Sequence, residues 1–271
     1  RGWEAYRSNH LMNPLRANQN NAEYNTSNYH YPTSTGIQFG GLGGSENYIY
    51  MAIRAPMMVE PKAATDVFKV DTRGSSGDGT RPSYRLGSPV DMLFVKNKTQ
   101  ANGTYIGSRL QGARYMLTHS SQTEAAYGDY KFDYPNGVGT PTNTDSNEVA
   151  WMWKRAKGYF DEVTWKGNAT ARTIPHSLGV APEMIWVKNR DATENWFVYA
   201  ASEGLDKWLY LSSAGGSQSG IATLAWNNTA PSATVLSLGT HNFTNDNNRN
   251  LIAYLFATLA GISKVGSYSG N

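Results

Sequence analysis

The chain contains one block of residues twice. Leu86–Asn97 returns as Leu178–Asn189, with Gly87 and Gly179 standing 92 positions apart, and both copies carry an acid, a methionine, two apolar residues and then Val-Lys-Asn. A period of this length exceeds the 20–50 residues of solenoid units, so each copy is large enough to form a small domain. The repeat therefore predicts a tandem array, an architecture more typical of scaffolds and adhesive rods than of enzymes.

The match extends well beyond this block. Arg114–Thr118 aligns with Lys207–Leu211, and Val149–Trp153 aligns with Ile252–Phe256. The offset grows toward the end of the copy, which indicates longer loops in the second copy, where insertions are tolerated. Since the chain begins with Arg1 rather than Met, we expect it to be a piece of a longer polypeptide.

The repeat divides the chain into five segments. We predict the C-terminal part of a first module at 1–57, a linker at 58–64, a complete module at 65–158 (repeat A), a complete module at 159–263 (repeat B), and the start of a further module or a linker at 264–271.

Short apolar runs bounded by Gly, Pro, Asn and Ser recur along both copies, and such runs are typical of β-strands. The run Leu251–Phe256 is apolar at every position. It suits a central strand covered on both faces or a short helix, and its length and flanks favour the strand. About eight strands per copy predict an all-β fold of tandem β-sandwich modules, of jelly-roll or lectin-like type.

The composition excludes several classes of function. The net charge is only +3 and no run of Lys or Arg is present, so we expect no nucleic-acid partner. No stretch approaches 18 apolar residues, so we expect no insertion into a membrane. Cysteine is absent, which removes disulfides and thiolate metal sites.

Candidates for catalysis and metal binding are weak. The histidines share no metal-ligand spacing and are predicted to lie at surfaces or turns: His10, His30, His119, His176 and His241. Carboxylates suitable for glycoside hydrolysis are Asp161 with Glu162, and the aligned Asp91 and Glu183. Because Asp91 and Glu183 each follow a Pro-containing turn, a hydrogen bond that closes the turn explains them without chemistry.

Two loops resemble ligand sites only superficially. Gly74–Gly79 lacks the Lys-Ser/Thr of a phosphate-binding loop. Asn245–Asn248 offers oxygen ligands for Ca²⁺ but lacks the EF-hand pattern, so Asx turns explain it more simply. We therefore predict no catalytic residue, no metal site and no cofactor.

Aromatic residues divide into two groups. Those that align between the copies, such as Tyr115 with Trp208, are predicted to be core residues. Aromatics outside the shared pattern are the better candidates for binding a ligand from exposed loops: Trp226, Tyr127, Tyr130 and Tyr134.

Three blocks resemble a repeat family of tail-fibre and appendage proteins of marine bacteriophages: Ile49–Arg54, Thr173–Asn189 and Trp226–Pro231. Repeat A departs from this pattern at Arg81–Ser88, and it lacks the Trp-Asn-Asn element. The resemblance implies a non-enzymatic structural protein located in the virion. Its expected partners are further copies of itself, other virion proteins and host-surface glycans.

Two alternatives stay open. The first is an array of carbohydrate-binding modules from a secreted or cell-surface bacterial protein. The second is a polysaccharide-degrading enzyme.

Overall fold

The structure is a computed structural model that describes residues 58–72, 82–101, 103–126, 130–132, 134–139, 147–213 and 215–268. It also gives the backbone of four short strands that form two pairs: β1 (Glu4–Ala5) with β2 (Leu15–Arg16), and β3 (His30–Pro32) with β4 (Ile37–Phe39). The rest of the predicted first module, the Gly74–Gly79 loop and Tyr127 lie outside the described residues.

Repeat A begins with the 3-10 turn η1 (Ala64–Asp66) and continues in eight described strands: β5 (Phe68–Thr72), β6 (Tyr84–Arg85), β7 (Met92–Asn97), β8 (Tyr105–Ser108), β9 (Arg114–Leu117), β10 (Ala125–Ala126), β11 (Gly137–Val138) and β12 (Glu148–Trp153). Six strands form an antiparallel sheet in the order β10-β9-β8-β7-β12-β5, and β11 pairs with β6.

Repeat B also contains eight described strands: β13 (Phe160–Lys166), β14 (Arg172–Pro175), β15 (Met184–Asn189), β16 (Phe197–Ala200), β17 (Lys207–Tyr210), β18 (Gln218–Ser219), β19 (Val235–Leu238) and β20 (Asn250–Phe256). The large sheet has the order β13-β20-β15-β16-β17-β18, and β14 pairs with β19. Two short helices, α1 (Ala222–Trp226) and α2 (Asn242–Asn245), are additions that the sequence pattern did not predict.

The two repeats have the same topology strand for strand, from β5 with β13 to β12 with β20. This confirms the all-β prediction and the expected eight strands per copy. Strand β20 is the predicted central strand, because it pairs with β13 on one side and β15 on the other. Every residue from Leu251 to Phe256 is buried.

The Val-Lys-Asn block ends a strand and starts a turn. The side chain of Asn97 accepts hydrogen bonds from the backbone N–H groups of Thr99 and Gln100, at 2.8 and 3.0 Å. Asn189 accepts the equivalent bonds from Asp191 and Ala192, both at 3.1 Å. Asparagine stabilises such turns because its side chain substitutes for a backbone acceptor, so the repeated Asn is explained by strand termination.

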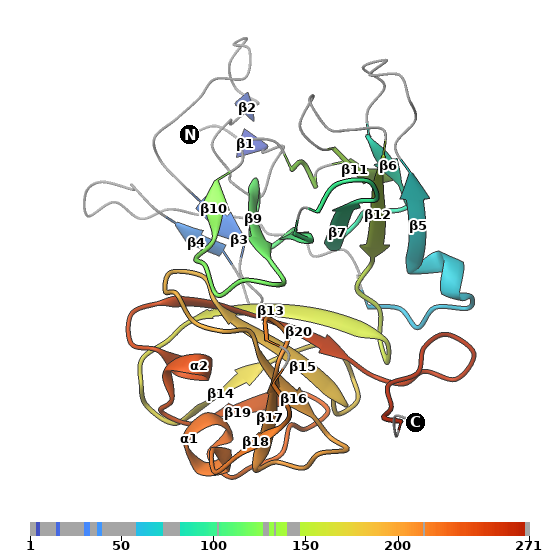
Figure 1. The fold of residues 1–271 in the computed structure, drawn as a ribbon. Helices are drawn as coiled ribbons and strands as arrows, with labels where there is room; N and C mark the ends of the chain where they lie inside the picture. Colours follow the sequence, from blue (N-terminus) through green and yellow to red (C-terminus); the bar gives the residue numbers. More distant parts are fainter. Residues whose placement is uncertain are drawn as a thin grey trace.

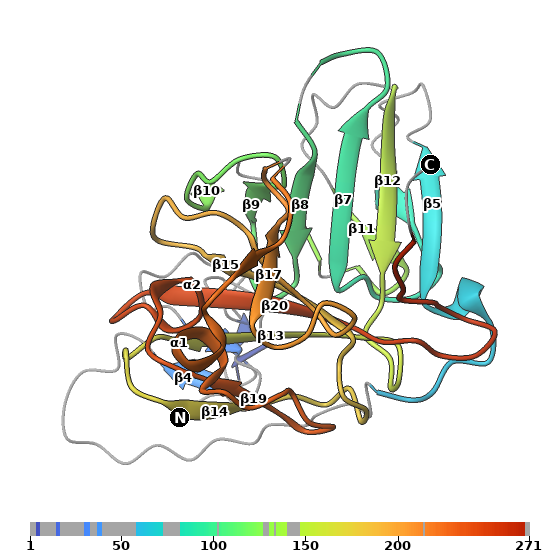
Figure 2. The same ribbon diagram turned by 60° about the horizontal axis from the view of Figure 1, so that its bottom comes forward.

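The sheets stack in layers, with the two large sheets packed against each other in the middle (Figures 1 and 2). In Figure 2 the strands of repeat A stand upright while β13 and β20 lie across them, as in crossed sheet packing. The outer face of each large sheet is covered by its own strand pair, β6 with β11 or β14 with β19, and helices α1 and α2 join the cover of repeat B. The chain therefore has one core per repeat and a third core between the repeats.

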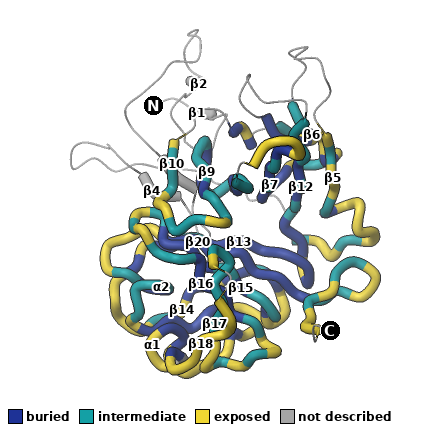
Figure 3. Tube along the Cα trace, in the orientation of Figure 1, coloured by how far each residue is buried: buried dark blue, intermediate teal, exposed yellow. Residues whose placement is uncertain are grey.

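Burial follows this arrangement (Figure 3). Strands β13 and β20, in the middle of the molecule, are dark along most of their length, whereas β5 at the edge of repeat A is largely exposed. Each repeat was expected to stand as a separate sandwich module, but the structure places a buried face of each against the other. Among the described residues no helix has the length and apolar character needed to cross a membrane.

Candidate functional site

The aromatic ligand-binding candidates are not gathered on one surface. Trp226 was expected on an exposed loop, and this was wrong: it ends helix α1, is 0% exposed, and packs against Phe197 and Tyr199 with ring centroids 5.6 and 5.5 Å apart. Tyr130 is also buried, in the core of repeat A. Tyr134 is half-buried.

The aligned acids Asp91 and Glu183 have a structural role, but they do not close the Pro-containing turn as the sequence suggested: each binds the segment that follows the central strand of its sheet. Asp91 Oδ2 accepts a hydrogen bond from the backbone N–H of Arg155 at 2.7 Å, two residues beyond the end of β12. Glu183 accepts from the N–H of Thr258, two residues beyond β20, at 3.3 Å and from the Thr258 hydroxyl at 2.8 Å. Each acid therefore ties the start of one strand, β7 or β15, to the segment that follows the central strand, β12 or β20.

His30 lies in strand β3, whereas His119, His176 and His241 lie at turns. His176 Nδ1 accepts from the N–H of Leu178, and its Nε2 lies 3.1 Å from the carbonyl of Ser232. His241 is the N-cap of α2, accepting from the N–H of Phe243. Burial lowers the pKa of both imidazoles. Within the described ranges no group of three or more His, Asp or Glu side chains is placed to hold a metal ion.

The Asn245–Asn248 segment is likewise structural. The Asn245 amide donates to the carbonyls of Thr170 and Gly239, both at 2.8 Å, and its oxygen accepts from the N–H of Asn168 at 3.0 Å. Asp246 accepts from Asn189 at 2.8 Å. These oxygens are therefore already engaged within the protein.

The most distinctive site is the interface core between the repeats. Against the buried cluster of this core, Phe94 of β7 stacks on Trp186 of β15, both half-buried, with ring centroids 5.8 Å apart and planes at 12°. These two residues occupy the same position in their repeats, because Phe94 lies opposite Trp151 of β12 and Trp186 lies opposite Tyr254, the equivalent residue of β20. Contact between equivalent residues is the property of an isologous, two-fold interface.

The surrounding rings repeat this symmetry. In repeat A, Phe94 contacts Trp153 at 5.0 Å, and Trp153 contacts Phe68 at 5.0 Å. In repeat B the equivalent chain runs from Trp186 to Phe256 at 4.7 Å and on to Phe160 at 5.2 Å. The interface is therefore built from one aromatic triplet contributed twice.

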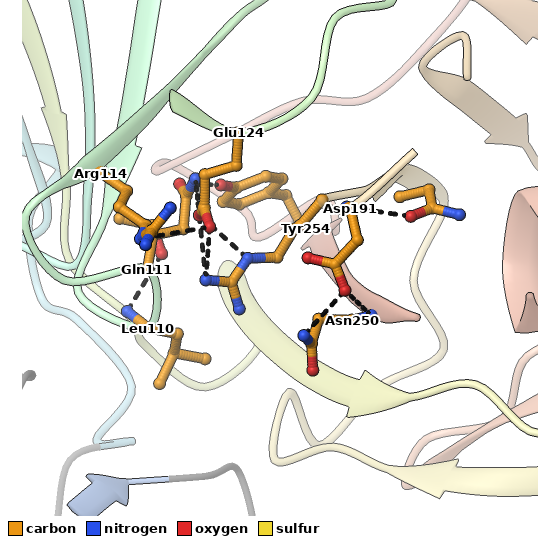
Figure 4. A network of polar contacts seen from close by, with 10 residues as sticks. Leu110, Gln111, Arg114, Glu124, Asp191, Asn250 and Tyr254 are labelled. Atoms are coloured by element: carbon orange, nitrogen blue, oxygen red, sulfur yellow. Dashed lines mark hydrogen bonds and ion pairs between the residues drawn. The ribbon is translucent and has the colours of Figure 1, made fainter. Parts of the chain in front are cut away.

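A polar network closes one side of the interface (Figure 4). The carboxylate of Glu124 in repeat A accepts from Nε and Nη2 of Arg190 in repeat B, each at 2.9 Å. Gln111 donates to Glu124 at 2.9 Å and accepts from the hydroxyl of Tyr254 at 3.0 Å. Bidentate Arg–carboxylate pairs fix geometry as well as charge, so this network orients the repeats.

Two further bonds cross the interface from repeat B. The ammonium of Lys188, which is fully buried, donates to the carbonyls of Ser121, Asn189 and Ala192, at 3.2, 2.7 and 3.3 Å. Its three protons thus have three acceptors. Burial lowers its pKa to about 8. The indole N–H of Trp196 donates to the carbonyl of Leu117 at 2.9 Å.

Glu162 is the exception in this interface. It lies on β13, is fully buried, and neither carboxyl oxygen has a hydrogen-bond partner among the described residues. Burial, and next the negative charge of Asp91, raise its pKa to about 8, against the opposing effects of Arg155, Ser108 and Arg109. Asp161, its neighbour, points to the opposite face of the strand, so the two acids do not form a catalytic pair.

Sequence reasoning missed the interface, and it named Glu162 only as a partner of Asp161 for hydrolysis. The available signal was the alignment of β13 with β5, which pairs Glu162 with Val70 through their equivalent partners Tyr254 and Trp151. A carboxyl at a position that the other copy fills with valine indicates a special environment. Which faces of the two copies meet could not be read from a single copy.

Comparison with known proteins adds a family. A protein-family model described as a domain of unknown function, DUF7483, matches residues 63–271. No curated protein and no solved structure matches the chain. The matched region contains both repeats together, as expected for two copies that share a core. The chain belongs to the DUF7483 family.

Proposed function

We propose that this chain is a non-enzymatic structural component of a phage virion, in a tail fibre or another external appendage. The observation that carries the proposal is the interface between the repeats. Its centre is one aromatic triplet used twice, and an ion pair, a buried ammonium and an indole N–H cross its side. Such a construction joins two modules into one stiff body, which is what a fibre or appendage requires.

The chemistry of the acids also supports this proposal. Asp91 and Glu183, the carboxylates best suited by sequence to hydrolysis, are engaged with backbone N–H groups at strand junctions. The resemblance of Thr173–Asn189 to phage appendage repeats supplies the location in the particle. We further propose that the chain assembles with copies of itself and with other virion proteins, and that loop tips contact the host surface.

The glycan-binding alternative has less support. Trp226 and Tyr130, two of its four candidate aromatics, are core residues and present no ring face to solvent. A glycan array would test it directly, with the half-buried Tyr134 as the remaining described candidate.

Immunogold electron microscopy of purified particles tests the proposal. Antibodies against the chain are expected to label a tail fibre or appendage. Recovery of the chain only from the secreted or cell-envelope fraction of bacteria, with unlabelled particles, would overturn it and favour the bacterial alternative.

A further inference from the structure

Glu162 lies beside two ion pairs where repeat B packs on the end of β8: Asp91 with Arg109, and Arg155 with Asp161, whose carboxyl points to the other face of β13. Asp91 Oδ1 accepts from Arg109 Nε at 3.0 Å, and Asp161 Oδ1 accepts from Arg155 Nε at 2.5 Å. Each arginine therefore has a carboxylate of its own. Glu162, the third acid, forms no ion pair of its own, and neither of its oxygens has a hydrogen-bond partner among the described residues, although the Ser108 hydroxyl lies close enough to oppose the rise in its pKa.

This count favours a neutral Glu162. Because each arginine is already paired with an aspartate, ionising Glu162 adds an uncompensated negative charge to a buried cluster. An unpaired buried charge is costly, and such a group takes up a proton instead. The remaining groups that face it are neutral: the Ser108 hydroxyl opposes the rise in the pKa of Glu162 without overcoming it, and the Tyr254 hydroxyl, whose pKa burial raises well above its usual value, donates to Gln111.

The charged groups beyond this cluster also have partners of their own. Arg190 and Glu124, which lie beyond Tyr254, form their own bidentate pair. Lys188 is bonded to three backbone carbonyls. No described cation is therefore free to turn toward Glu162 when it loses its proton.

Water is the remaining stabilising partner, and the interface blocks it. Glu162 lies under Ser108 and the following turn, which Gln111 ties to Tyr254. Hydration of a carboxylate at this position requires that the turn of repeat A lifts from β13 and β20. We propose that Glu162 is a pH-sensitive lock, whose neutral form keeps the repeats closed and whose ionisation in alkaline solution loosens the interface between them.

The fold itself does not require a carboxyl group at the position of Glu162. Repeat A has Val70 at the equivalent position of β5, and that side chain is 46% exposed. The strand can therefore be built without a carboxyl, and the acid occurs in the copy where the position is covered by the partner repeat. The inference does not depend on the proposed virion role, since it concerns only how the two repeats hold together.

A distance measurement on the full chain tests the lock. The sequence has no cysteine, so Lys98→Cys in repeat A and Ser202→Cys in repeat B, both at exposed positions, can carry a fluorescent donor and acceptor. We expect a constant transfer efficiency at mildly acidic pH and a reversible fall centred near pH 8. Glu162→Gln should abolish that fall, whereas Glu60→Gln, which removes an exposed carboxyl, should leave it unchanged.

A second measurement avoids reliance on the variant. Infrared spectra of the wild type should contain the C=O stretch of a buried neutral carboxylic acid, lost over the same pH range in which the distance changes. A constant distance up to pH 9.5, or a fall that persists in a folded Glu162→Gln variant, overturns the proposal. So does an infrared spectrum in which every carboxyl is already ionised near pH 6.

Discussion

Phe94 and Trp186 lie face to face across the interface between the repeats, with planes 12° apart, although they belong to different copies of the repeat. The two residues occupy equivalent positions in their copies. Each also contacts the equivalent aromatic ring of its own repeat, Trp153 or Phe256. A contact between equivalent positions closes on itself rather than continuing. The two repeats therefore form a closed pair, and the module pair is the structural unit of this chain.

Removing this contact should destabilise the whole pair. We expect Trp186→Ala to lower the free energy of unfolding by about 2–3 kcal/mol, toward the low end for an aromatic deletion because the ring is half-buried. Phe94→Ala should have a similar effect, and the double variant should cost less than the sum, since the residues touch. Urea denaturation measures all three, with Tyr268→Ala, which alters a side chain that is 94% exposed, as the control.

If the double variant loses as much stability as the two single variants together, that result would contradict the stacked arrangement. A Tyr268→Ala variant that is destabilised as strongly as Trp186→Ala would indicate a general effect of losing an aromatic ring.

The acids at the strand junctions should differ in importance. Asp91→Asn replaces a carboxylate that holds both Arg109 and the N–H of Arg155, so we expect a loss of about 2 kcal/mol. Glu183→Gln keeps one acceptor for Thr258 at a half-buried position, so the loss should stay near 1 kcal/mol. Thermal unfolding of both variants ranks them, and the reverse order would contradict this account.

Much of the fold could be predicted from the sequence because the repeat gives each strand two independent examples. The aligned acids Asp91 and Glu183 were identified in this way, whereas the strand at Leu251–Phe256 was identified from its length and its flanking residues. Trp226 was misplaced because it has no counterpart in repeat A, and a short helix such as α1 has too few residues to show a period. Each large sheet has two apolar faces, one in the core of its own repeat and one in the core between the repeats. The alternation of side chains along a strand does not show which face packs against the other repeat.

The ion pair between the repeats should contribute far more than an ion pair at the surface. Glu124 is almost fully buried beside Arg190, so Glu124→Gln leaves an arginine without its carboxylate and should cost about 3 kcal/mol. Glu203→Gln removes a surface pair with Lys207 at 3.7 Å and should change stability by about 0.5 kcal/mol or less. Denaturant midpoints of the two variants should be measured at low and moderate salt. If both variants lose the same stability, the Glu124 pair contributes no more than an ion pair at the surface.

Stability should fall as the pH rises through the range in which Glu162 is neutral only in the folded protein. The unfolded chain releases this proton near the ordinary carboxyl pKa of 4.5, while the folded chain keeps it up to about pH 8. Between these values the folded state binds one more proton, so each pH unit lowers the free energy of unfolding by up to about 1.4 kcal/mol relative to Glu162→Gln. Below the lower value both states are protonated and the difference between the two proteins should be constant. Urea titrations of wild type, Glu162→Gln and Glu60→Gln at half-unit steps from pH 4 to 9 measure the slopes. Parallel curves for wild type and Glu162→Gln would mean that Glu162 is ionised in the folded protein, and the unpaired position found here would then have to be stabilised by a partner outside the described residues.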